Sequence, residues 1–90
     1  MNVVHDPARS RFELLVDGEL SVCQYRRVGD VVQIVHTEVP ASLQGHGIAA
    51  RLVEAALAWV RAEGLRVQPL CSYVAVYMRR HPETQDLLVR

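Results

Sequence analysis

The stretch that decides the fold runs Val39-Pro40-Ala41-Ser42-Leu43-Gln44-Gly45-His46-Gly47-Ile48-Ala49. A strand is expected before it, over residues 31–39, and a helix after it, because apolar residues recur every three or four positions over 47–63. Gly45 and Gly47 can adopt positive φ and let a ligand approach the backbone closely. Successive N–H groups at a helix start form an anion site suited to a pyrophosphate. The alternative is an ordinary strand-to-helix turn with two convenient glycines.

The segment before this stretch predicts an antiparallel meander. Residues 11–16 alternate apolar and polar, as in a half-buried strand. Asp17-Gly18 is a hairpin signal, 19–28 is the return strand, and Gly29-Asp30 turns the chain into the third strand. The polar lead-in, Met1–Ser10, is expected to be partly loose.

The segment after the helix predicts one more strand and a second helix. Gly64 suits a left-handed helix cap, and residues 65–70 form a short apolar strand. This strand should pair parallel to the third one, because a helical crossover joins them. Ser72 can cap a helix that runs to about Arg80 before His81-Pro82 stops it, and 83–89 add a turn. The expected fold is α+β, in the order β-β-β-α-β-α, within a single domain over 1–90.

Composition excludes several classes of protein. The chain has 90 residues and a mass of 10.1 kDa, half of its residues are apolar, and its net charge is zero. These values argue against a disordered tail and against a general nucleic-acid binder. The sequence contains no apolar run long enough to span a membrane, and residues 1–10 lack the apolar stretch of a signal peptide. With only two cysteines, a cytoplasmic location is expected. All ten basic residues are arginine.

The loop also resembles that of a known family. Gln44-Gly45-His46-Gly47-Ile48-Ala49 is similar to the Gln/Arg-x-x-Gly-x-Gly/Ala signature of the GNAT superfamily of N-acetyltransferases. The resemblance extends over about 31–81 and implies a minimal GNAT-like fold whose loop wraps the pyrophosphate of acetyl-CoA. The residues implied in cofactor binding at the loop are Val39, Gln44, Gly45, His46, Gly47, Ile48 and Ala49. The chain lacks the family's helices between the first two strands and its extra C-terminal strands, segments that usually shape the acceptor pocket.

Cys71 is the first candidate for chemistry. It lies between a strand end and a helix start, where the helix dipole and nearby N–H groups favour the thiolate. The resemblance implies that the thioester of acetyl-CoA lies near the splay between the third and fourth strands, beside Cys71. Cys71 would then be a nucleophile that takes the acetyl group, or a thiol that traps CoA. The alternative is a small buried apolar residue, which is also the expectation for Cys23.

His36 and Glu38 are candidates for a general base. They share one face of the third strand, because side chains alternate along it. Histidine is a suitable base near neutral pH, and Glu38 could orient it or act alone. The alternative is that both hold the loop by surface hydrogen bonds. The mid-strand position where many relatives have a glutamate base holds Gln33, which cannot take a proton.

Two tyrosines of the second helix are candidates for cofactor contact. Tyr77-Met78-Arg79-Arg80-His81 resembles the family's Tyr-x-x-x-Gly, with His81 in place of glycine. In the family that tyrosine protonates the departing CoA thiolate. Tyr73 lies one turn earlier on the same side. For both tyrosines the alternative is core packing with a satisfied hydroxyl, and Trp59 is expected to pack.

The expected function is acetyl-CoA-dependent transfer of an acetyl group to an amine of unknown identity. Direct transfer and an acetyl-Cys71 intermediate are both open. The rival interpretation is a non-catalytic module that senses acyl-CoA or holds CoA near Cys71. A structural adaptor is the third interpretation and requires the loop match to be accidental. No metal, nucleic-acid or membrane partner is expected, and the chain should be a monomer or weak homodimer.

Overall fold

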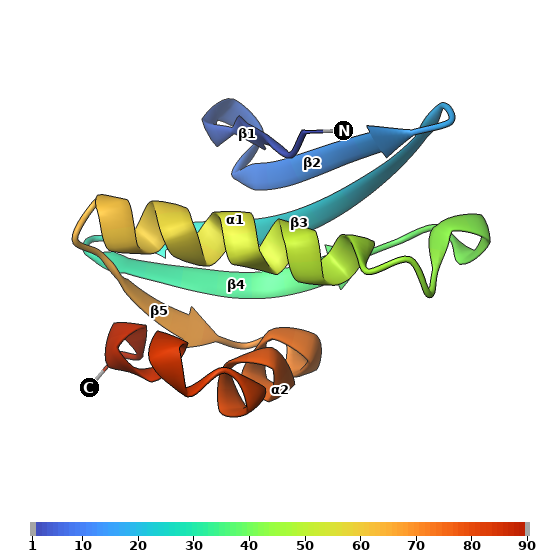
Figure 1. The fold of residues 1–90 in the computed structure, drawn as a ribbon. Helices are drawn as coiled ribbons and strands as arrows, with labels where there is room; N and C mark the ends of the chain where they lie inside the picture. The colour runs from blue at the N-terminus through green and yellow to red at the C-terminus, as the bar shows by residue number, and fades with distance from the viewer. Residues whose placement is uncertain (1, 90) are drawn as a thin grey trace.

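The computed structural model describes residues 2–89 and shows an α+β fold (Figure 1). A five-stranded sheet has the order β1-β2-β3-β4-β5, and only β4 and β5 are parallel neighbours. The strands are β1 (Val4–Asp6), β2 (Arg11–Val16), β3 (Glu19–Val28), β4 (Val31–Glu38) and β5 (Arg66–Pro69). The helices are α1 (Ile48–Ala62) and α2 (Ser72–Arg80), with 3-10 turns η1 (Pro7–Arg9), η2 (Ala41–Leu43) and η3 (Pro82–Leu87). The predicted meander, crossover helix and parallel strand are confirmed.

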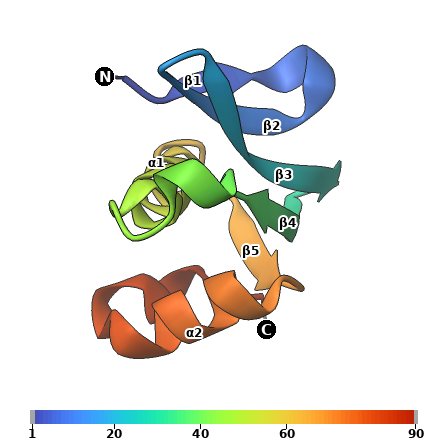
Figure 2. The same cartoon turned by 90° about the vertical axis from the view of Figure 1, so that its right-hand side faces the viewer.

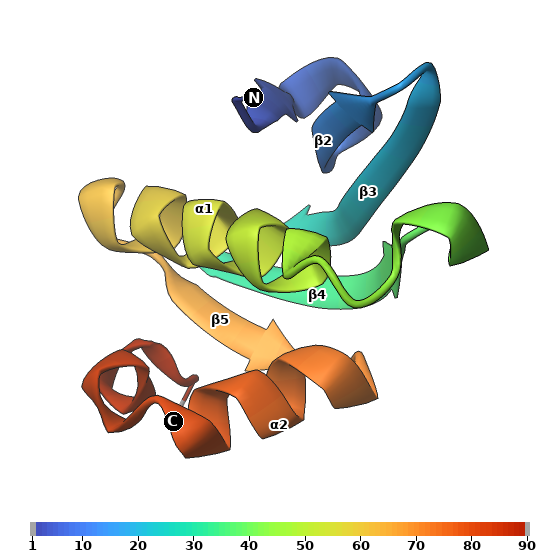
Figure 3. The same cartoon turned by 45° about the vertical axis from the view of Figure 1, so that its right-hand side comes forward.

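The core lies between the sheet and α1. Helix α1 covers one face of the strands (Figure 2), while α2 and η3 lie beyond β5 (Figure 3). Sheet and helices all contribute fully buried apolar side chains: Leu14, Cys23, Val32, Ile34, Leu52, Val53, Val60, Val67, Val74 and Met78. The apolar stripe of α1 is therefore buried as its periodicity predicts.

The expectation that residues 1–10 form a partly loose lead-in is wrong for the residues that the structure describes. Residues 4–6 form β1, which pairs antiparallel with β2, and η1 follows. His5 anchors this strand, because its ring stacks on Phe12 at 4.1 Å and its Nε2 lies 2.7 Å from the Tyr25 hydroxyl. Trp59 of α1 closes the ring cluster at 4.7 Å from His5, which confirms its packing role. A three-residue strand has too short a pattern to recognise without these distant partners, and Met1 lies outside the described residues.

A bulge in β4 changes which residues share a face. Gln24 pairs with His36 and Tyr25 pairs with Ile34, so Val35 is the extra residue. Before the bulge, Ile34 faces the core. After it, Thr37 faces the core, opposite buried Cys23. His36 and Glu38 consequently lie on the other face of the sheet, away from α1.

The sheet splays after this bulge. Pairing between β4 and β5 ends at Ile34 and Pro69, and the amides of Leu70 and Cys71 both donate to the Ile34 carbonyl, at 3.0 and 2.9 Å. Within residues 2–89 no strand pairs with the rest of β4 on this side. Residues 35–38 therefore present a backbone edge that no described strand covers.

The prediction that Ser72 caps α2 is wrong by one residue. The predicted cap, Ser72, is the first helical residue, and Cys71 holds the N-cap position with extended backbone. The shared Ile34 carbonyl fixes the turn one residue early. The helix predicted over 47–63 is α1, in which Gly47 and Glu63 are the caps rather than helical residues, and the left-handed Gly64 follows it as predicted.

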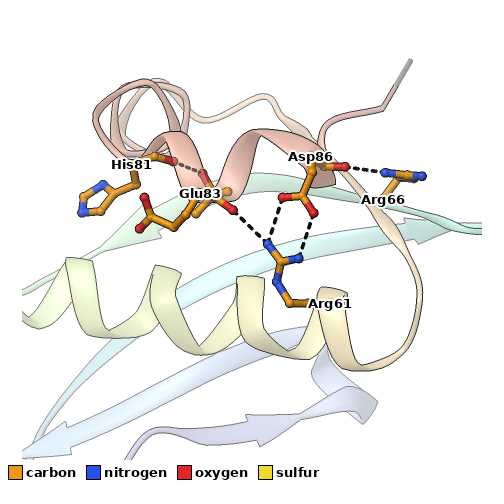
Figure 4. A network of polar contacts seen from close by, with 6 residues as sticks. Arg61, Arg66, His81, Glu83 and Asp86 are labelled. Atoms are coloured by element: carbon orange, nitrogen blue, oxygen red, sulfur yellow. Dashed lines mark hydrogen bonds and ion pairs between the residues drawn. The ribbon is translucent and has the colours of Figure 1, made fainter.

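The C-terminal segment, residues 82–89, packs beside β5. The predicted last turn is a 3-10 segment, η3. Figure 4 shows how Arg61 of α1 holds it: the guanidinium pairs with both Asp86 oxygens at 2.8 and 2.9 Å and donates to the Glu83 carbonyl. The Val89 amide then donates to the Val67 carbonyl, which covers the outer edge of β5.

Candidate functional site

The glycine loop has the geometry of a backbone site at a helix start. Gly45 and Gly47 have φ values of 84° and 75°, and Gly47 is the N-cap of α1. A Cβ at either glycine would meet nothing within 4 Å, so the space beside the loop is open. The Gln44 side chain donates to the Val39 carbonyl at 3.1 Å and holds the loop closed. Amides at this end of α1 favour an anion.

A hollow of about 260 Å³, called here the loop pocket, lies against these residues. It is lined by Val39, Leu43, Gln44, Gly45, Gly47, Ile48, Ala49 and Tyr73. The structure thus brings together most of the expected cofactor residues from the loop and one tyrosine of α2. His46 instead lines a separate hollow with Asp17 and Ser42.

Cys71 lies at the splay, where the free edge of β4 faces the start of α2. Its thiol is half-buried and donates to Thr37 Oγ1 at 3.7 Å, and the Thr37 hydroxyl donates to Cys23 Sγ at 3.9 Å. Burial raises the pKa of the Cys23 thiol to about 11, although the Thr37 hydrogen bond opposes this shift. Cys23 is fully buried, as expected, and Cys71 is the accessible thiol.

Thr37 is a site residue that sequence reasoning missed. Strict alternation from Ile34 would turn Thr37 away from the core, and only the bulge brings its hydroxyl between the two thiols. An irregularity in strand pairing leaves no local signal in one sequence.

His36 and Glu38 form a hydrogen-bonded pair, with Nε2 3.2 Å from Oε1. They share a face, as predicted, and both side chains are exposed. Their face of the sheet is opposite to that of Thr37. Gln33 is engaged elsewhere, since it donates to Gln68 and accepts from Arg26.

The two tyrosines of α2 lie in different surroundings. Both line one hollow along α2, but only Tyr73 also lines the loop pocket, and only Tyr77 also lines the hollow toward η3. The Tyr77 ring is stacked on His81, with centroids 3.9 Å apart and 14° between the planes. Burial, with Glu54 and Glu83 nearby, raises the pKa of the Tyr77 hydroxyl.

Two further properties follow from the described part of the chain. No three His, Cys, Asp or Glu side chains within residues 2–89 are grouped so that they could hold a metal ion. None of the described helices is long and apolar enough to cross a membrane.

A sheet that splays between parallel β4 and β5, with a glycine loop at the start of the crossover helix, defines the GNAT type of α+β protein. The family described as GCN5-related N-acetyl-transferase matches residues 11–87, and the chain belongs to this family.

Relatives of known name support this assignment. The chain is 37% identical over 90 residues to Protein NATD1 of mouse, covering 97% of this chain and 82% of that protein. It is 33% identical to Protein NATD1 of zebrafish over the same length. The solution structure of a GCN5-like protein from Staphylococcus aureus superposes with a TM-score of 0.77, at 23% identity, over 98% of this chain and 87% of that one. At that identity the likeness shows the fold.

Proposed function

We propose that this protein binds acetyl-CoA at the loop pocket and transfers its acetyl group to an amine. Family membership supports the cofactor class in general. The observation that carries the proposal is one of proximity: Tyr73 lines the loop pocket and lies two residues from Cys71, the thiol at the splay. A molecule with a pyrophosphate and a thioester arm can therefore occupy the loop and reach Cys71.

The backbone would supply most of the binding. The amides of residues 45–49 face the pyrophosphate, where the positive end of α1 stabilises negative charge. The free edge of β4, residues 35–38, can hydrogen-bond the amide groups of the pantetheine arm as a neighbouring strand would. This course brings the thioester beside Thr37 and Cys71 at the splay.

Direct transfer needs one base and one acid. His36, oriented by Glu38 at 3.2 Å, would accept the proton of the attacking amine. The amine nitrogen bonds to the thioester carbonyl carbon, the C–S bond breaks, and CoA leaves as a thiolate. The resemblance assigns the proton for this thiolate to Tyr77, while Tyr73 is the tyrosine that lines the loop pocket.

A covalent route proceeds in two steps, with Cys71 as the nucleophile. The Cys71 thiolate attacks the thioester carbonyl and releases CoA, which leaves an acetyl-cysteine. The amine then attacks this second thioester and regenerates the Cys71 thiol. Thr37 can donate its hydroxyl hydrogen to the Cys71 thiolate instead of to Cys23. This hydrogen bond would stabilise the negative charge of the thiolate.

A CoA-binding module without turnover is the second candidate function. Gln33 cannot act as a base, and the His36–Glu38 pair is exposed to water rather than enclosed. Both observations favour weak chemistry over a tight catalytic centre.

The deciding experiment incubates the protein with acetyl-CoA and a panel of amines. A catalyst releases free CoA at a rate that depends on an amine, while a sensor binds CoA, by calorimetry, without release. Absence of CoA binding would contradict both functions. The intact mass before amine addition tests the covalent route, because the chain has no lysine to collect stray acetyl groups.

The Cys71→Ala variant separates the two routes. If it acetylates amines as fast as the wild type, the thiol is not a nucleophile. If transfer stops while CoA still binds with unchanged affinity, the covalent route stands.

A further inference from the structure

One hydroxyl group links the two thiols of the protein in a hydrogen-bonded chain that runs from the core to the splay. The Cys71 thiol donates to Thr37 Oγ1 at 3.7 Å, and the Thr37 hydroxyl donates to Cys23 Sγ at 3.9 Å. Cys23 and Thr37 are partners in the register of β3 and β4, and the amide of Cys71 donates to the Ile34 carbonyl at 2.9 Å. The backbones of β3, β4 and the start of α2 therefore hold the three side chains against one another.

This chain of hydrogen bonds can run in either of two directions. A threonine hydroxyl has one hydrogen and two lone pairs, and a protonated thiol can both donate and accept. Thr37 can therefore accept from Cys71 and donate to Cys23, as in the structure, or accept from Cys23 and donate to Cys71. The change needs only rotation about the C–O and C–S bonds, and no proton passes from one atom to another.

A negative charge on Cys71 permits only one of these directions. A thiolate has no hydrogen to donate and is a strong acceptor, so the Thr37 hydroxyl turns toward it. Burial raises the pKa of the Cys23 thiol to about 11, and a charge on Cys71 acts in the same direction, so Cys23 keeps its hydrogen at neutral pH. Cys23 can then donate this hydrogen to a lone pair of Thr37 Oγ1.

Other titratable groups on the surrounding elements point elsewhere or have their own partners. Tyr25 of β3 is bonded to His5, and Tyr77 of α2 is stacked on His81. The remaining titratable side chains near this end of the sheet are exposed: His36 and Glu38 of β4, Arg51 and Glu54 of α1, and Tyr73 of α2. The hydroxyl of Thr37, in contrast, faces the thiol at the splay directly.

We propose that the chain of Cys23, Thr37 and Cys71 reverses its direction when Cys71 becomes a thiolate, so that the buried Cys23 thiol holds the Thr37 hydroxyl on the reactive sulfur. A hydroxyl that accepts one hydrogen bond donates a stronger one, because each bond in such a chain polarises the next. Thr37 and Cys23 are then positioning residues that act through Cys71. Cys23 packs in the core and in addition sets the reactivity of the thiol at the splay.

The inference deepens the proposed function, because it concerns the thiol of the covalent route, and it can be tested without CoA. The test measures how fast iodoacetamide alkylates Cys71 between about pH 6 and pH 10, with intact mass and peptide mapping as the readout. The rate follows the fraction of thiolate, so the pH of half-maximal alkylation, here called the midpoint, reports how well the thiolate is stabilised.

Substitutions at Thr37 test the hydroxyl. Thr37→Val keeps the shape of the side chain but removes the donor, and should raise the midpoint by about one pH unit, which makes alkylation about tenfold slower at neutral pH. Thr37→Ser should keep the midpoint of the wild type, since its hydroxyl remains.

Substitutions at Cys23 test the reversal itself. Cys23→Ala removes the hydrogen that the buried thiol donates, and should raise the midpoint and slow alkylation about threefold at neutral pH. Cys23→Ser supplies a hydroxyl hydrogen at the same place and should not raise the midpoint. Ser21→Ala is the control, since its hydroxyl lies on the same face of β3 and has no hydrogen-bond partner among residues 2–89, and its midpoint should equal that of the wild type.

The sign of the Cys23→Ala effect decides between two roles of the buried thiol. If Cys23 only competes for the Thr37 hydrogen, Cys23→Ala lowers the midpoint, and a lowered or unchanged midpoint would overturn the inference. An unchanged midpoint in Thr37→Val would overturn it as well, and if that variant does not fold, the two Cys23 variants decide. A wild type that does not bind CoA would contradict the proposed function alone, because no ligand enters the alkylation measurement.

Discussion

The two cysteines lie on either side of one hydroxyl group, that of Thr37. They differ in what else surrounds them. Cys23 is fully buried, with a pKa raised to about 11 by burial, whereas Cys71 opens to the splay at the start of α2. One thiol is therefore packing and the other is available for reaction.

This difference predicts the order of labelling by a thiol probe. Cys71 should react first at neutral pH, Cys23 should react only when the protein unfolds, and bound CoA should slow the reaction at Cys71. Peptide mapping after timed alkylation checks the order. Labelling of Cys23 at the same rate as Cys71 in the folded protein would contradict it, and Cys71→Ala is the control for site assignment.

Ser21 is the buried residue whose hydroxyl has no hydrogen-bond partner among residues 2–89. A buried hydroxyl without a partner loses its hydrogen bonds to water and gains none in the protein, at a cost of about 1–3 kcal/mol. Ser21→Ala should therefore leave the free energy of unfolding unchanged or raise it, as measured by urea denaturation. Thr84→Val is the matched control, since it removes a 2.7 Å bond to the His81 carbonyl and should destabilise by about 1 kcal/mol. Destabilisation by Ser21→Ala of similar size would mean that an ordered water satisfies the hydroxyl.

At the scale of elements, the irregular part of β4 does most to shape the candidate site. The bulge at Val35 directs Thr37 to the thiols and His36 to the opposite face, and the end of β5 at Pro69 frees the edge beyond it. A regular β4 would place His36 on the core face. The site thus depends on one extra residue in one strand.

The glycine loop allows a matched pair of substitutions. Gly47 and Gly29 both have positive φ, at 75° and 60°, and a Cβ at either meets nothing within 4 Å. Valine at either position should cost similar stability, about 1–2 kcal/mol, because its Cβ disfavours a left-handed backbone. Only Gly47→Val should also block backbone approach at the loop, and we expect CoA affinity to fall at least tenfold, or 1.4 kcal/mol.

Calorimetry with CoA and urea denaturation on both variants checks this expectation. Gly29 lies in the hairpin between β3 and β4, so Gly29→Val reports the strain alone. Equal CoA affinities for the two folded variants would mean that the loop does not bind the pyrophosphate.

At the scale of the whole molecule, β1 joins the sheet to α1 through a cluster of four rings. His5 stacks on Phe12, contacts Trp59 and bonds to the Tyr25 hydroxyl. Burial lowers the pKa of His5 below its ordinary value, and the charge of Asp6 opposes this only in part. Folding therefore favours the neutral imidazole of His5 over the charged one.

The sign of the pH effect follows from this shift. Because the folded pKa is below the unfolded one, protonation favours the unfolded chain, so stability is full above about pH 6.5 and falls as the pH drops below it. Melting temperatures between pH 5 and 8 should show a smaller acid-side loss for His5→Phe than for the wild type. If the melting temperatures of the two proteins fall in parallel with pH, protonation of His5 does not contribute to the loss of stability.

Sequence alone determined the elements whose signals are local. The change from alternation to a helical period across Val39–Ala49, the hairpin at Asp17-Gly18 and the two loop glycines predict the meander, the crossover helix and the family. These signals depend on neighbours within a few residues, which a single sequence displays directly.

Only the tertiary structure decided the arrangement of the site. Three features depend on contacts between residues far apart in the chain: the docking of β1, the bulge that places Thr37, and the early cap at Cys71. His5 needs Tyr25 and Trp59, and the start of α2 needs the Ile34 carbonyl. Such contacts form only when the sheet and helices pack, so their energies select among conformations that the local sequence permits equally.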